Sequence, residues 1–499
     1  MRRLRNGLIC ALATGLSACA SSTTNDPPSL ASLRTPTSDL KVRQRALERV
    51  YEDNAGNPAG LAATRQTLKD IVWTPSQPAP LRVNAMRKLL DDPDEATQRE
   101  VRDLGRLLLP REQSREMVVL LGQTAAERGW EDYVPSLVRA YARPARLGVK
   151  DEERAERIAL ERLRPGVSVK QLAFDVFMNP PEMPPSYGLD WKQRTRNDAW
   201  EVLGRIDPEG EFRAGVLGAE AIGSSDPTIA ALARGKRDLR GVPITADQLA
   251  WLVSLSNGAN SVNAAWWGEA SAAITRTNQD LLELRHAEAI RWTLANRPDR
   301  LTSSREALLG ELRQRLAGRR FHSRSNSTDG KPAPERLPDS EDRLTFADLV
   351  TILAIDDALG SERVRDALFR QAEMDRKDTT TEYGGMLTFQ VRGAASFGSE
   401  ATAVLYAPRP GQRMGDERFV ASDDMLAASD CAIAHYHFHA QRVRNKEYAG
   451  PSGGDLQYAA RYGRSCLVLT SVGEGVLGVD YYQPNGVVID LGEIRAGTR

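Results

Sequence analysis

The chain is poor in histidine and cysteine, and it has no excess of charge of either sign. Only five histidines and four cysteines occur in 499 residues, and 67 basic side chains balance 67 acidic ones. This neutral balance argues against an extended surface for nucleic acid or for anionic lipid, so we expect no nucleic-acid partner. The chain also lacks long apolar runs. The apolar stretch 7–18 is too short to span a bilayer.

The N-terminus has the features of an export signal. A basic segment, Met1–Arg5, precedes the apolar stretch, and Leu16–Cys19 resembles the lipobox of bacterial lipoproteins, in which the cysteine is lipidated. We expect acylation of Cys19 and attachment to the membrane through this lipid alone, on the periplasmic side of the cell envelope. Ala20 after the cysteine favours the outer membrane. The alternative is an ordinary secretory signal with an incidental cysteine.

The region after the N-terminal segment carries helical patterns at a regular spacing. Ala46–Val50 is followed by similar segments at Ala85–Leu89, Ala159–Leu163 and Ala199–Leu203, at offsets of 39, 74 and 40 residues. A period of about 40 residues resembles HEAT or armadillo-like solenoids, in which neighbouring helix pairs bury each other's apolar faces. The longest offset predicts one degenerate copy, near Met117–Leu121. We expect such an arm to bind a protein partner or the substrate.

Three of the five histidines, His435, His437 and His439, alternate with Tyr436 and Phe438. On a strand this pattern places the imidazoles on one face and the aromatic rings on a core-facing side. Alternate residues lie about 6.6 Å apart, a gap that two imidazoles can close onto one metal ion. Two histidines and a carboxylate leave a fourth position open on Zn²⁺, as in catalytic sites. The competing interpretation is an exposed strand whose histidines face solvent.

His437–His439 followed by Ser452–Asp455 resembles the His-x-His…Ser-x-x-Asp motif of JAMM (MPN/JAB-type) metallopeptidases. That family also has an upstream glutamate that leads a strand, and Glu382, which precedes a Tyr-Gly-Gly-Met-Leu segment, matches it. Two features depart from the family. Ala440 stands where the family usually has proline, and the segment 440–451 between the second histidine and the serine is longer than usual.

The resemblance implies an α/β fold with a curved mixed sheet flanked by helices, and a zinc site. It implies that His437, His439 and Asp455 bind Zn²⁺. It further implies Glu382 as the general base toward the water at the metal, and Ser452 as the hydrogen-bond donor to the tetrahedral oxyanion. Ser452 also fits the N-cap of a helix whose first turn contains Asp455.

Two assignments stay open from the sequence. The family's ligand pair is either His437 with His439 or His435 with His437, and the first choice keeps the following loop closer to the family's length. Cys431 and Cys466 either form a disulfide in an oxidising compartment or remain buried thiols.

The predicted fold class is multidomain, with an all-α HEAT-like solenoid followed by an α/β JAMM-type domain that contains a mixed sheet. The expected divisions are a signal peptide at 1–18, a flexible tether at 19–38, helical repeats at 39–320, a linker at 321–343 and the metallopeptidase domain at 344–499. The expected function is that of an exported, lipid-anchored zinc metallopeptidase that hydrolyses an amide bond in a protein or peptide. The alternative is a non-catalytic envelope scaffold with an inactive JAMM-like domain.

Overall fold

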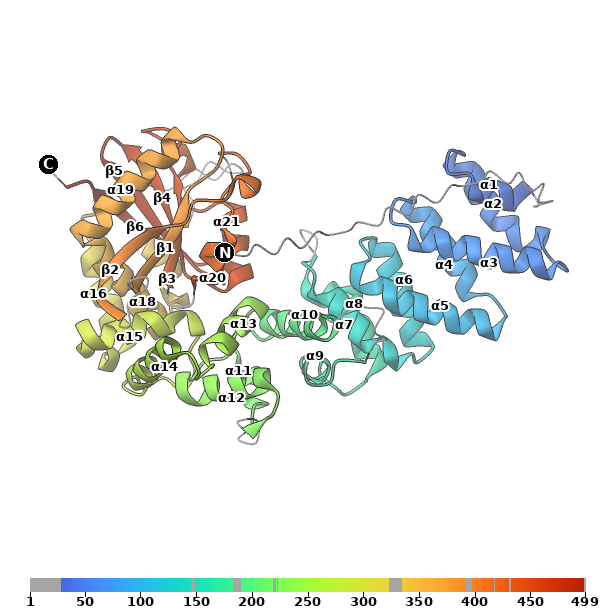
Figure 1. Cartoon of the computed structure of the whole chain (residues 1–499), viewed down its shortest axis with the longest axis horizontal. Coiled ribbons are helices and arrows are strands. Elements are labelled where there is room, and N and C mark those ends of the chain that lie inside the picture. Colours follow the sequence, from blue (N-terminus) through green and yellow to red (C-terminus); the bar gives the residue numbers. More distant parts are fainter. Residues whose placement is uncertain are drawn as a thin grey trace, which may run out of the picture. The chain divides into compact units, whose positions relative to one another are not determined.

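The computed structural model describes residues 28–497, except 145–148, 183–189, 219–220, 222, 323–333, 391–396, 417 and 430–431. Its contacts divide the chain into two compact units, Met1–Ala140 with Ala145–Pro165 and Tyr141–Pro144 with Gly166–Arg499. We call them the helical unit and the sheet unit, and Figure 1 shows the elements of each. Within the described residues, no helix combines the length and the apolar character that crossing a membrane requires.

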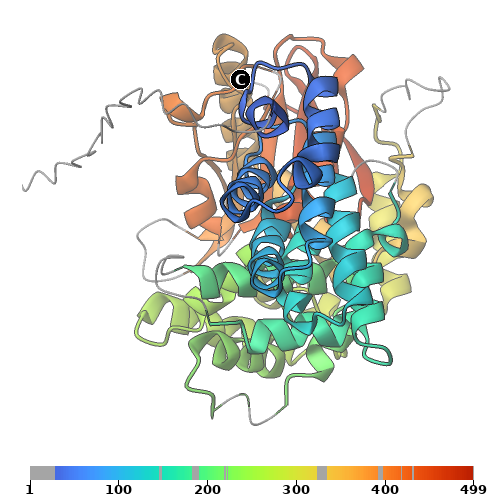
Figure 2. The same cartoon turned by 90° about the vertical axis from the view of Figure 1, so that its right-hand side faces the viewer.

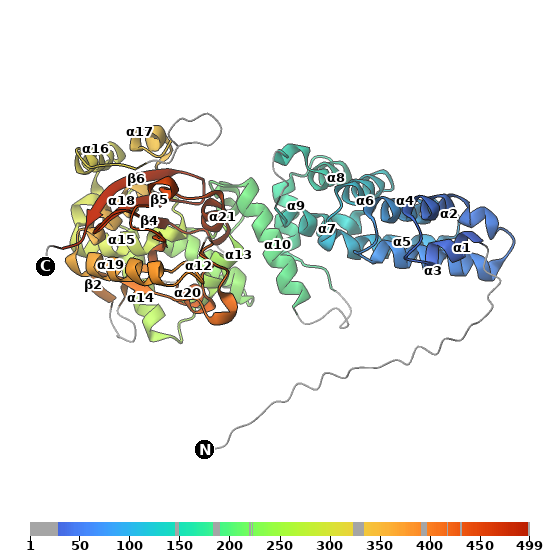
Figure 3. The same ribbon diagram turned by 90° about the horizontal axis from the view of Figure 1, so that it is seen from above.

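The helices of the helical unit pack in two layers (Figure 3), which Figure 2 shows from the α1–α2 end. They are α1 (Pro28–Arg34), α2 (Leu40–Asp53), α3 (Pro58–Trp73), α4 (Ala79–Leu90), α5 (Glu95–Leu108), α6 (Arg115–Glu127), α7 (Val134–Ala142) and α8 (Ala155–Leu163). The even-numbered helices α2, α4, α6 and α8 contact one another in order, and α1, α3 and α5 do the same. Each layer therefore buries the apolar faces of its own helices and of the opposite layer.

The segments that suggested a repeat all lie on helices and bury their apolar side chains. They are Ala46–Val50 on α2, Ala85–Leu89 on α4, Met117–Leu121 on α6, Ala159–Leu163 on α8 and Ala199–Leu203 on α10. The prediction that this part of the chain is helical is confirmed. The similar segments share apolar residues at helical spacing, and this spacing is the reason that they form helices.

The tether predicted over 19–38 is too long. Residues 28–34 form α1, which buries Leu30 and Leu33 against α2 and α3. Arg43 of α2 donates a hydrogen bond to the Leu33 carbonyl at 3.1 Å and fixes the end of this helix. Two leucines at helical spacing give the segment an apolar face, and this face outweighs the Ser- and Pro-rich composition around it. Residues 19–27 of the expected tether, which include Cys19, and the signal peptide lie outside the described residues.

Helices α9 to α16 form the first part of the sheet unit. Their bounds are α9 (Val169–Met178), α10 (Trp191–Ile206), α11 (Glu211–Gly215), α12 (Pro227–Leu239), α13 (Ala246–Leu255), α14 (Ser261–Ile274), α15 (Ala287–Asn296) and α16 (Arg305–Leu316). They are followed by α17 (Leu337–Ser340), α18 (Phe346–Leu359) and α19 (Glu362–Lys377).

A six-stranded mixed sheet forms the rest of this unit. In sequence order its strands are β1 (Gly384–Gln390), β2 (Phe397–Leu405), β3 (Ala432–His439), β4 (Cys466–Gly473), β5 (Val476–Tyr482) and β6 (Val488–Arg495). The spatial order is β2-β1-β3-β4-β5-β6, and every neighbouring pair is antiparallel except β3 and β4. A parallel pair needs a crossover connection, and α21 (Gly453–Tyr462) supplies it.

Helices cover both faces of the sheet (Figure 1). On one face α15 and α19 pack on the strands, where Trp292 stacks on Phe389 with ring centroids 4.6 Å apart and Tyr436 donates a hydrogen bond to Gln371. The other face carries α21 and the short helix α20 (Asp423–Ala427), and Ala459 of α21 packs in an apolar cluster with strand residues. The predicted combination of a helical region and a sheet flanked by helices is therefore confirmed.

The segment 321–343, predicted to be a linker, is attached to the sheet where it is described. The Asp490 amide of β6 donates to the Glu335 carbonyl at 2.6 Å, and the His322 amide donates to the Asp490 carboxylate at 2.7 Å. Residues 337–340 form α17, which also contacts β6. The outer strand of a sheet has backbone amides and carbonyls without a partner strand, and this segment forms hydrogen bonds with some of these groups on β6.

The boundary between the two compact units also lies elsewhere than the sequence analysis placed it, because 166–320 belongs to the same unit as the sheet. Arg285 is one cause. This buried arginine, in the 3₁₀ turn Leu284–His286, pairs with Asp348 of α18 at 2.6 Å and with Glu283 at 2.7 Å. It also donates a hydrogen bond to the hydroxyl of Ser465, just before β4, at 3.0 Å and to that of Tyr481 on β5 at 3.1 Å.

We expect Arg285→Met to lower the free energy of unfolding of the sheet unit by about 3–5 kcal/mol, because it leaves the buried Asp348 carboxylate without its guanidinium partner. Urea unfolding followed by tryptophan fluorescence measures this change. The matched control is Arg363→Met, which removes a 3.5 Å ion pair with Glu400 on the surface. That control is expected to cost less than about 1 kcal/mol. Equal effects of the two variants would contradict the assignment.

Candidate metal centre

The predicted site residues meet at the carboxyl end of β3. Glu382 lies two residues before β1, whose Gly384 is paired with His437 of β3. Asp455 lies in the first turn of α21, the helix that connects β3 to its parallel neighbour β4. The carboxyl end of a parallel strand and the start of the helix that follows it are a common place for ligand sites in α/β folds.

The three histidines face the same side of the sheet, as the alternation predicts. His437 and His439 meet Asp455 of α21, and His435 meets Tyr458 of the same helix. Tyr436 and Phe438 are fully buried, and Tyr436 contacts the opposite layer through Gln371. The interpretation of solvent-facing histidines is wrong, since at most 9% of any of the three is exposed.

Two imidazole nitrogens and the two oxygens of one carboxylate lie close enough to surround one ion. The Nε2 atoms of His437 and His439 are 3.3 Å apart. Asp455 places one carboxylate oxygen 3.3 Å from the first Nε2 and the other 3.8 Å from the second. Ligand atoms held about 2.0–2.1 Å from a tetrahedral zinc ion are separated by about 3.3 Å. The donor set and its spacing therefore fit Zn²⁺.

Backbone contacts orient two of the ligands. The Tyr448 carbonyl lies 2.7 Å from Nδ1 of His439 and can only accept, so Nδ1 carries the proton and Nε2 presents a lone pair. Ser452 and Asp455 form a capping box at the start of α21, in which the Ser452 amide donates to the Asp455 carboxylate at 2.6 Å. Strand alternation thus directs the two histidines of β3, and helix capping directs Asp455 of α21, toward the same place.

The electrostatics of this corner favour a positive charge. Burial raises the pKa of Asp455, but the His437 and His439 imidazoles and the Ser452 amide outweigh it and hold this pKa well below its usual range. Burial lowers the pKa of His437, but Asp455 and Glu382 outweigh burial and raise it. A bound cation or a proton on His437 satisfies the same field, so metal binding and protonation of His437 compete.

Glu382 stands beside the ligands without being closest to them. One of its oxygens lies within 4.8 Å of the ligand nitrogens of both His437 and His439. It is 3% exposed, and burial, helped by Asp455, raises the pKa of Glu382 to about 7. The side chain of Gln441 donates a hydrogen bond to this carboxylate at 3.1 Å. Glu382 therefore suits the role of a proton acceptor beside a bound metal ion. The role of third ligand suits Asp455 better, because its oxygens lie closer to the two imidazole nitrogens.

A glycine allows an aromatic ring to cover the site. Phe419 stacks on His437 with ring centroids 5.1 Å apart and an interplanar angle of 15°. A Cβ atom on Gly384 would lie 2.2 Å from the Phe419 ring. Gly384, two residues after Glu382, is therefore needed for close approach of this ring to the strand.

His435, the alternative ligand, lies outside the cluster. Its Nδ1 is 2.8 Å from the Tyr458 hydroxyl, and its Nε2 is buried without a hydrogen-bond partner. Burial, with a smaller contribution from Arg464, holds the pKa of His435 well below its usual range, so this ring is neutral. Of the two pairs that the sequence left open, the structure brings His437 and His439 together.

A second group of possible ligands, Glu283, His286 and Asp348, also lies within 4.8 Å. Arg285 pairs with both of its carboxylates, and His286 is 3.0 Å from Asp348. The guanidinium already supplies the positive charge that a metal ion would bring. We therefore interpret this group as a structural ion-pair network.

Sequence reasoning missed most of what surrounds the ligands. The loop 440–451 contributes the Tyr448 carbonyl, Gln441 and Asn445, whose side chain donates to the His439 carbonyl at 3.2 Å. The unusual length of this loop was a signal that it differs in function, but no residue in it could be singled out. Cys466 is a buried free thiol, and Cys431, its possible partner, lies outside the described residues.

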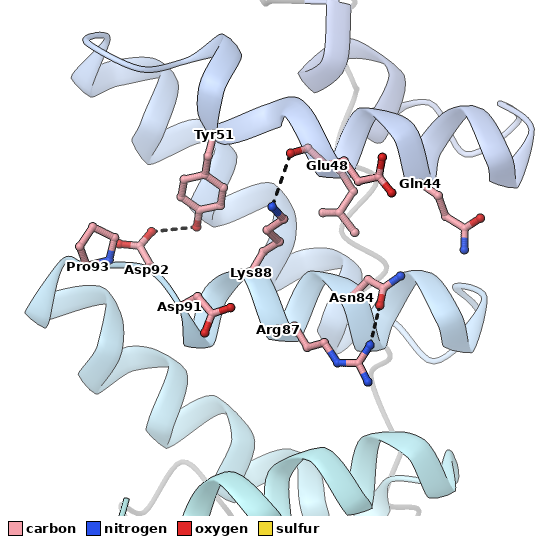
Figure 4. A pocket seen from close by; sticks show the side chains of 10 residues that line it. Gln44, Glu48, Tyr51, Asn84, Arg87, Lys88, Asp91, Asp92 and Pro93 are labelled. Atoms are coloured by element: carbon pink, nitrogen blue, oxygen red, sulfur yellow. Dashed lines mark hydrogen bonds between the residues drawn. The ribbon is translucent and has the colours of Figure 1, made fainter.

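The helical unit has a groove of its own, of about 510 Å³, between α2 and α4. Figure 4 shows side chains of both charges along it, including Glu48 from α2 and Lys88 from α4, and the neutral Tyr51 of α2. Tyr51 donates to Asp92 at 2.8 Å, and Lys88 approaches the Glu48 carbonyl at 3.5 Å. Its lining residues include neither histidine nor cysteine.

We expect the full chain, prepared without chelator, to carry close to one zinc ion per molecule and His439→Ala to lose most of it. His435→Ala is the matched control on the same face of the same strand and is expected to keep its zinc. Elemental analysis after dialysis measures the content. Loss of zinc in His435→Ala but not in His439→Ala would assign the site to the other pair, and a metal-free wild type would exclude the site.

Comparison with protein-family models, with curated proteins and with solved structures gives no match for this chain. The resemblance to JAMM metallopeptidases therefore depends on the motif residues and on the way the structure arranges them.

Proposed function

We propose that the sheet unit is a zinc-dependent amide hydrolase of the JAMM type, which cleaves a peptide or isopeptide bond. The observation that supports this most directly is the meeting of His437, His439 and Asp455 at 3.3–3.8 Å with the Glu382 carboxylate beside them. Two imidazoles and one carboxylate are the ligand set of several catalytic zinc sites, and they leave a fourth position for water or substrate.

A zinc ion held by these three residues supplies Lewis acidity, which polarises an amide carbonyl and lowers the pKa of water at the ion to about 7. Glu382 then takes the proton from the attacking water. Burial raises the pKa of this carboxyl group, which makes it a better proton acceptor, and the same group can then pass the proton to the leaving amine. Gln441 holds one of its oxygens in place while it does so.

Ser452 is the proposed hydrogen-bond donor to the negative charge that develops on the attacked carbonyl. Its Oγ accepts a hydrogen bond from the Asp455 amide at 3.2 Å, which fixes the oxygen and leaves its own proton to donate. Gly453 and Gly454, which follow it, are exposed, so substrate can approach this end of α21. A donor aimed at a developing oxyanion is typically among the larger contributions to catalysis.

We propose that the helical unit binds a protein partner or the substrate through the groove between α2 and α4. The groove carries both charges, which suits a polar polypeptide segment better than an apolar ligand. The proposed substrate is a protein or peptide of the cell envelope. The alternative, a scaffold lipoprotein with an inactive domain, predicts that the wild type neither retains zinc nor hydrolyses amides.

We expect Glu382→Gln to keep zinc and to lose hydrolysis by about 100- to 10,000-fold, because the amide preserves shape but cannot accept a proton. Turnover of a mixed library of linear and isopeptide-linked peptides, read as newly formed amines, measures the loss. The matched control is Glu447→Gln, an exposed carboxylate in the loop 440–451 whose side chain is 54% accessible. Full activity of Glu382→Gln together with an inactive Glu447→Gln would transfer the role of base to Glu447.

We further propose that the protein is anchored to the envelope by acylation of Cys19. The wild type is expected in the membrane fraction, released only by detergent, since acylation with more than one chain anchors stably whereas a single chain is marginal. Cys19→Ser is expected to block processing or to yield an unlipidated form. Cys10→Ser is the control within the same N-terminal segment. A soluble cytoplasmic wild type with Met1 intact would exclude the anchor.

A further inference from the structure

The loop 440–451 exposes several charged side chains beside the proposed zinc site. Arg442, Arg444, Lys446 and Glu447 are all exposed. Glu447 lies 3.6 Å from Arg442, so these two charges balance each other. Within the part of the chain that the structure describes, the side chains of Arg444 and Lys446 form neither a hydrogen bond nor an ion pair. The loop therefore carries two positive charges that no acidic group compensates.

Buried contacts fix the backbone between these two charges. Asn445, which separates them in the sequence, is 1% exposed. Its side chain donates hydrogen bonds to the His439 carbonyl at 3.2 Å and to Gln441 at 2.7 Å. Its amide donates to the Ser471 carbonyl of β4 at 2.7 Å. The loop is thus held against the two strands next to the metal ligands, and the positive charges flank the residue that holds it.

The same loop exposes an aromatic side chain beside a metal ligand. The Tyr448 carbonyl accepts a hydrogen bond from Nδ1 of His439 at 2.7 Å, whereas Tyr448 as a whole is 58% exposed. Val443, on the other side of Asn445, is 41% exposed. Two exposed apolar side chains on one short loop next to a site favour contact with another molecule. Basic groups and an aromatic ring therefore occur together at the edge of the site.

We propose that Arg444, Lys446 and Tyr448 form a recognition surface, which binds an acidic segment of the peptide substrate next to the bond that is cleaved. This inference rests on the proposed function and names the class of substrate. The two cations attract the carboxylates of the segment, and the Tyr448 ring packs on its apolar groups. Because the loop backbone is already fixed, little conformational entropy is lost when the segment binds.

The charges of the site itself do not oppose such a segment when zinc is bound. Glu382 and Asp455 contribute at most two negative charges, and a zinc ion brings two positive charges that balance them. The charge that a substrate meets beside the site is then set by Arg444 and Lys446. Complementary charge of this kind acts mainly on the rate of association and on the choice of partner.

The experiment compares the zinc-loaded full chain with two double variants that remove the same charge. Arg444→Gln with Lys446→Gln changes the recognition surface. Lys192→Gln with Arg194→Gln is the matched control, because both side chains are exposed on α10, have the same spacing and also lack a hydrogen bond or ion pair within the described residues. The substrates are three sets of fluorogenic peptides that differ only in carrying glutamate, glutamine or lysine at the same positions around the amide.

We expect the wild type to have its highest kcat/KM for the glutamate peptides and its lowest for the lysine peptides. The Arg444→Gln, Lys446→Gln variant should lose about 2- to 30-fold in kcat/KM for the glutamate peptides, mainly through KM, because each exposed ion pair contributes about 1.4- to 5-fold. Its zinc content and its turnover of the glutamine peptides should match those of the wild type.

The control variant should retain the preference for glutamate peptides in full. Salt at about 0.5 M should reduce this preference in the wild type, since it screens charges on an exposed surface. Equal kcat/KM of the wild type for glutamate and glutamine peptides would overturn this inference and leave the proposed function intact. A preference that survives in the Arg444→Gln, Lys446→Gln variant would overturn it as well.

Two further outcomes separate this inference from its alternatives. If the wild type shows no peptide preference but binds phosphatidylglycerol vesicles through Arg444 and Lys446, the surface recognises anionic lipid and the inference is wrong. If no peptide is hydrolysed, the proposed function is wrong, and fluorescence anisotropy with a labelled glutamate peptide tests the surface by itself. Weaker binding by the Arg444→Gln, Lys446→Gln variant would then support the surface, and equal binding would overturn it.

Discussion

Two imidazole nitrogens and a carboxylate oxygen meet in a buried corner of the sheet unit, and this meeting constrains everything around it. The Nε2 atoms of His437 and His439 lie 3.3 Å apart, and Asp455 adds negative charge beside them. Such an arrangement needs a positive charge, from an ion or a proton, to be stable. Strand alternation fixes the spacing of the imidazoles, and the capping box with Ser452 fixes the carboxylate at the start of α21.

The surroundings of this corner explain how a loop longer than the family's is compatible with a working site. The loop 440–451 folds back over the ligands, so its Tyr448 carbonyl sets the tautomer of His439 and its Gln441 side chain holds Glu382. From the opposite side, the Asp375 carboxylate accepts a hydrogen bond from the Tyr383 amide, next to Glu382. The loop thus provides supporting contacts to two residues of the proposed zinc site.

The helices before the sheet are part of the same compact unit, and this affects how the protein can be divided. Arg285 places its guanidinium between Asp348 of α18 and the hydroxyls of Ser465 and Tyr481. Cutting the chain at 343 would leave Asp348 without that partner. A fragment that begins at residue 344 would therefore contain all five proposed site residues but would lack one contact that holds their sheet to its helices.

Local pattern was sufficient to predict the helices, the strand of histidines and the capped helix with Asp455. Each depends on residues that are neighbours in the sequence, through alternation, apolar spacing or capping. The grouping of Glu382 with these residues was expected only from the resemblance to the JAMM family. The sequence could not show Asp375 or Arg285 as partners of the sheet, since each resembles an ordinary surface charge until distant elements pack around it. The choice of His439 over His435 and the unit boundary near residue 166 also required the tertiary structure, because both depend on which helix lies against which strand.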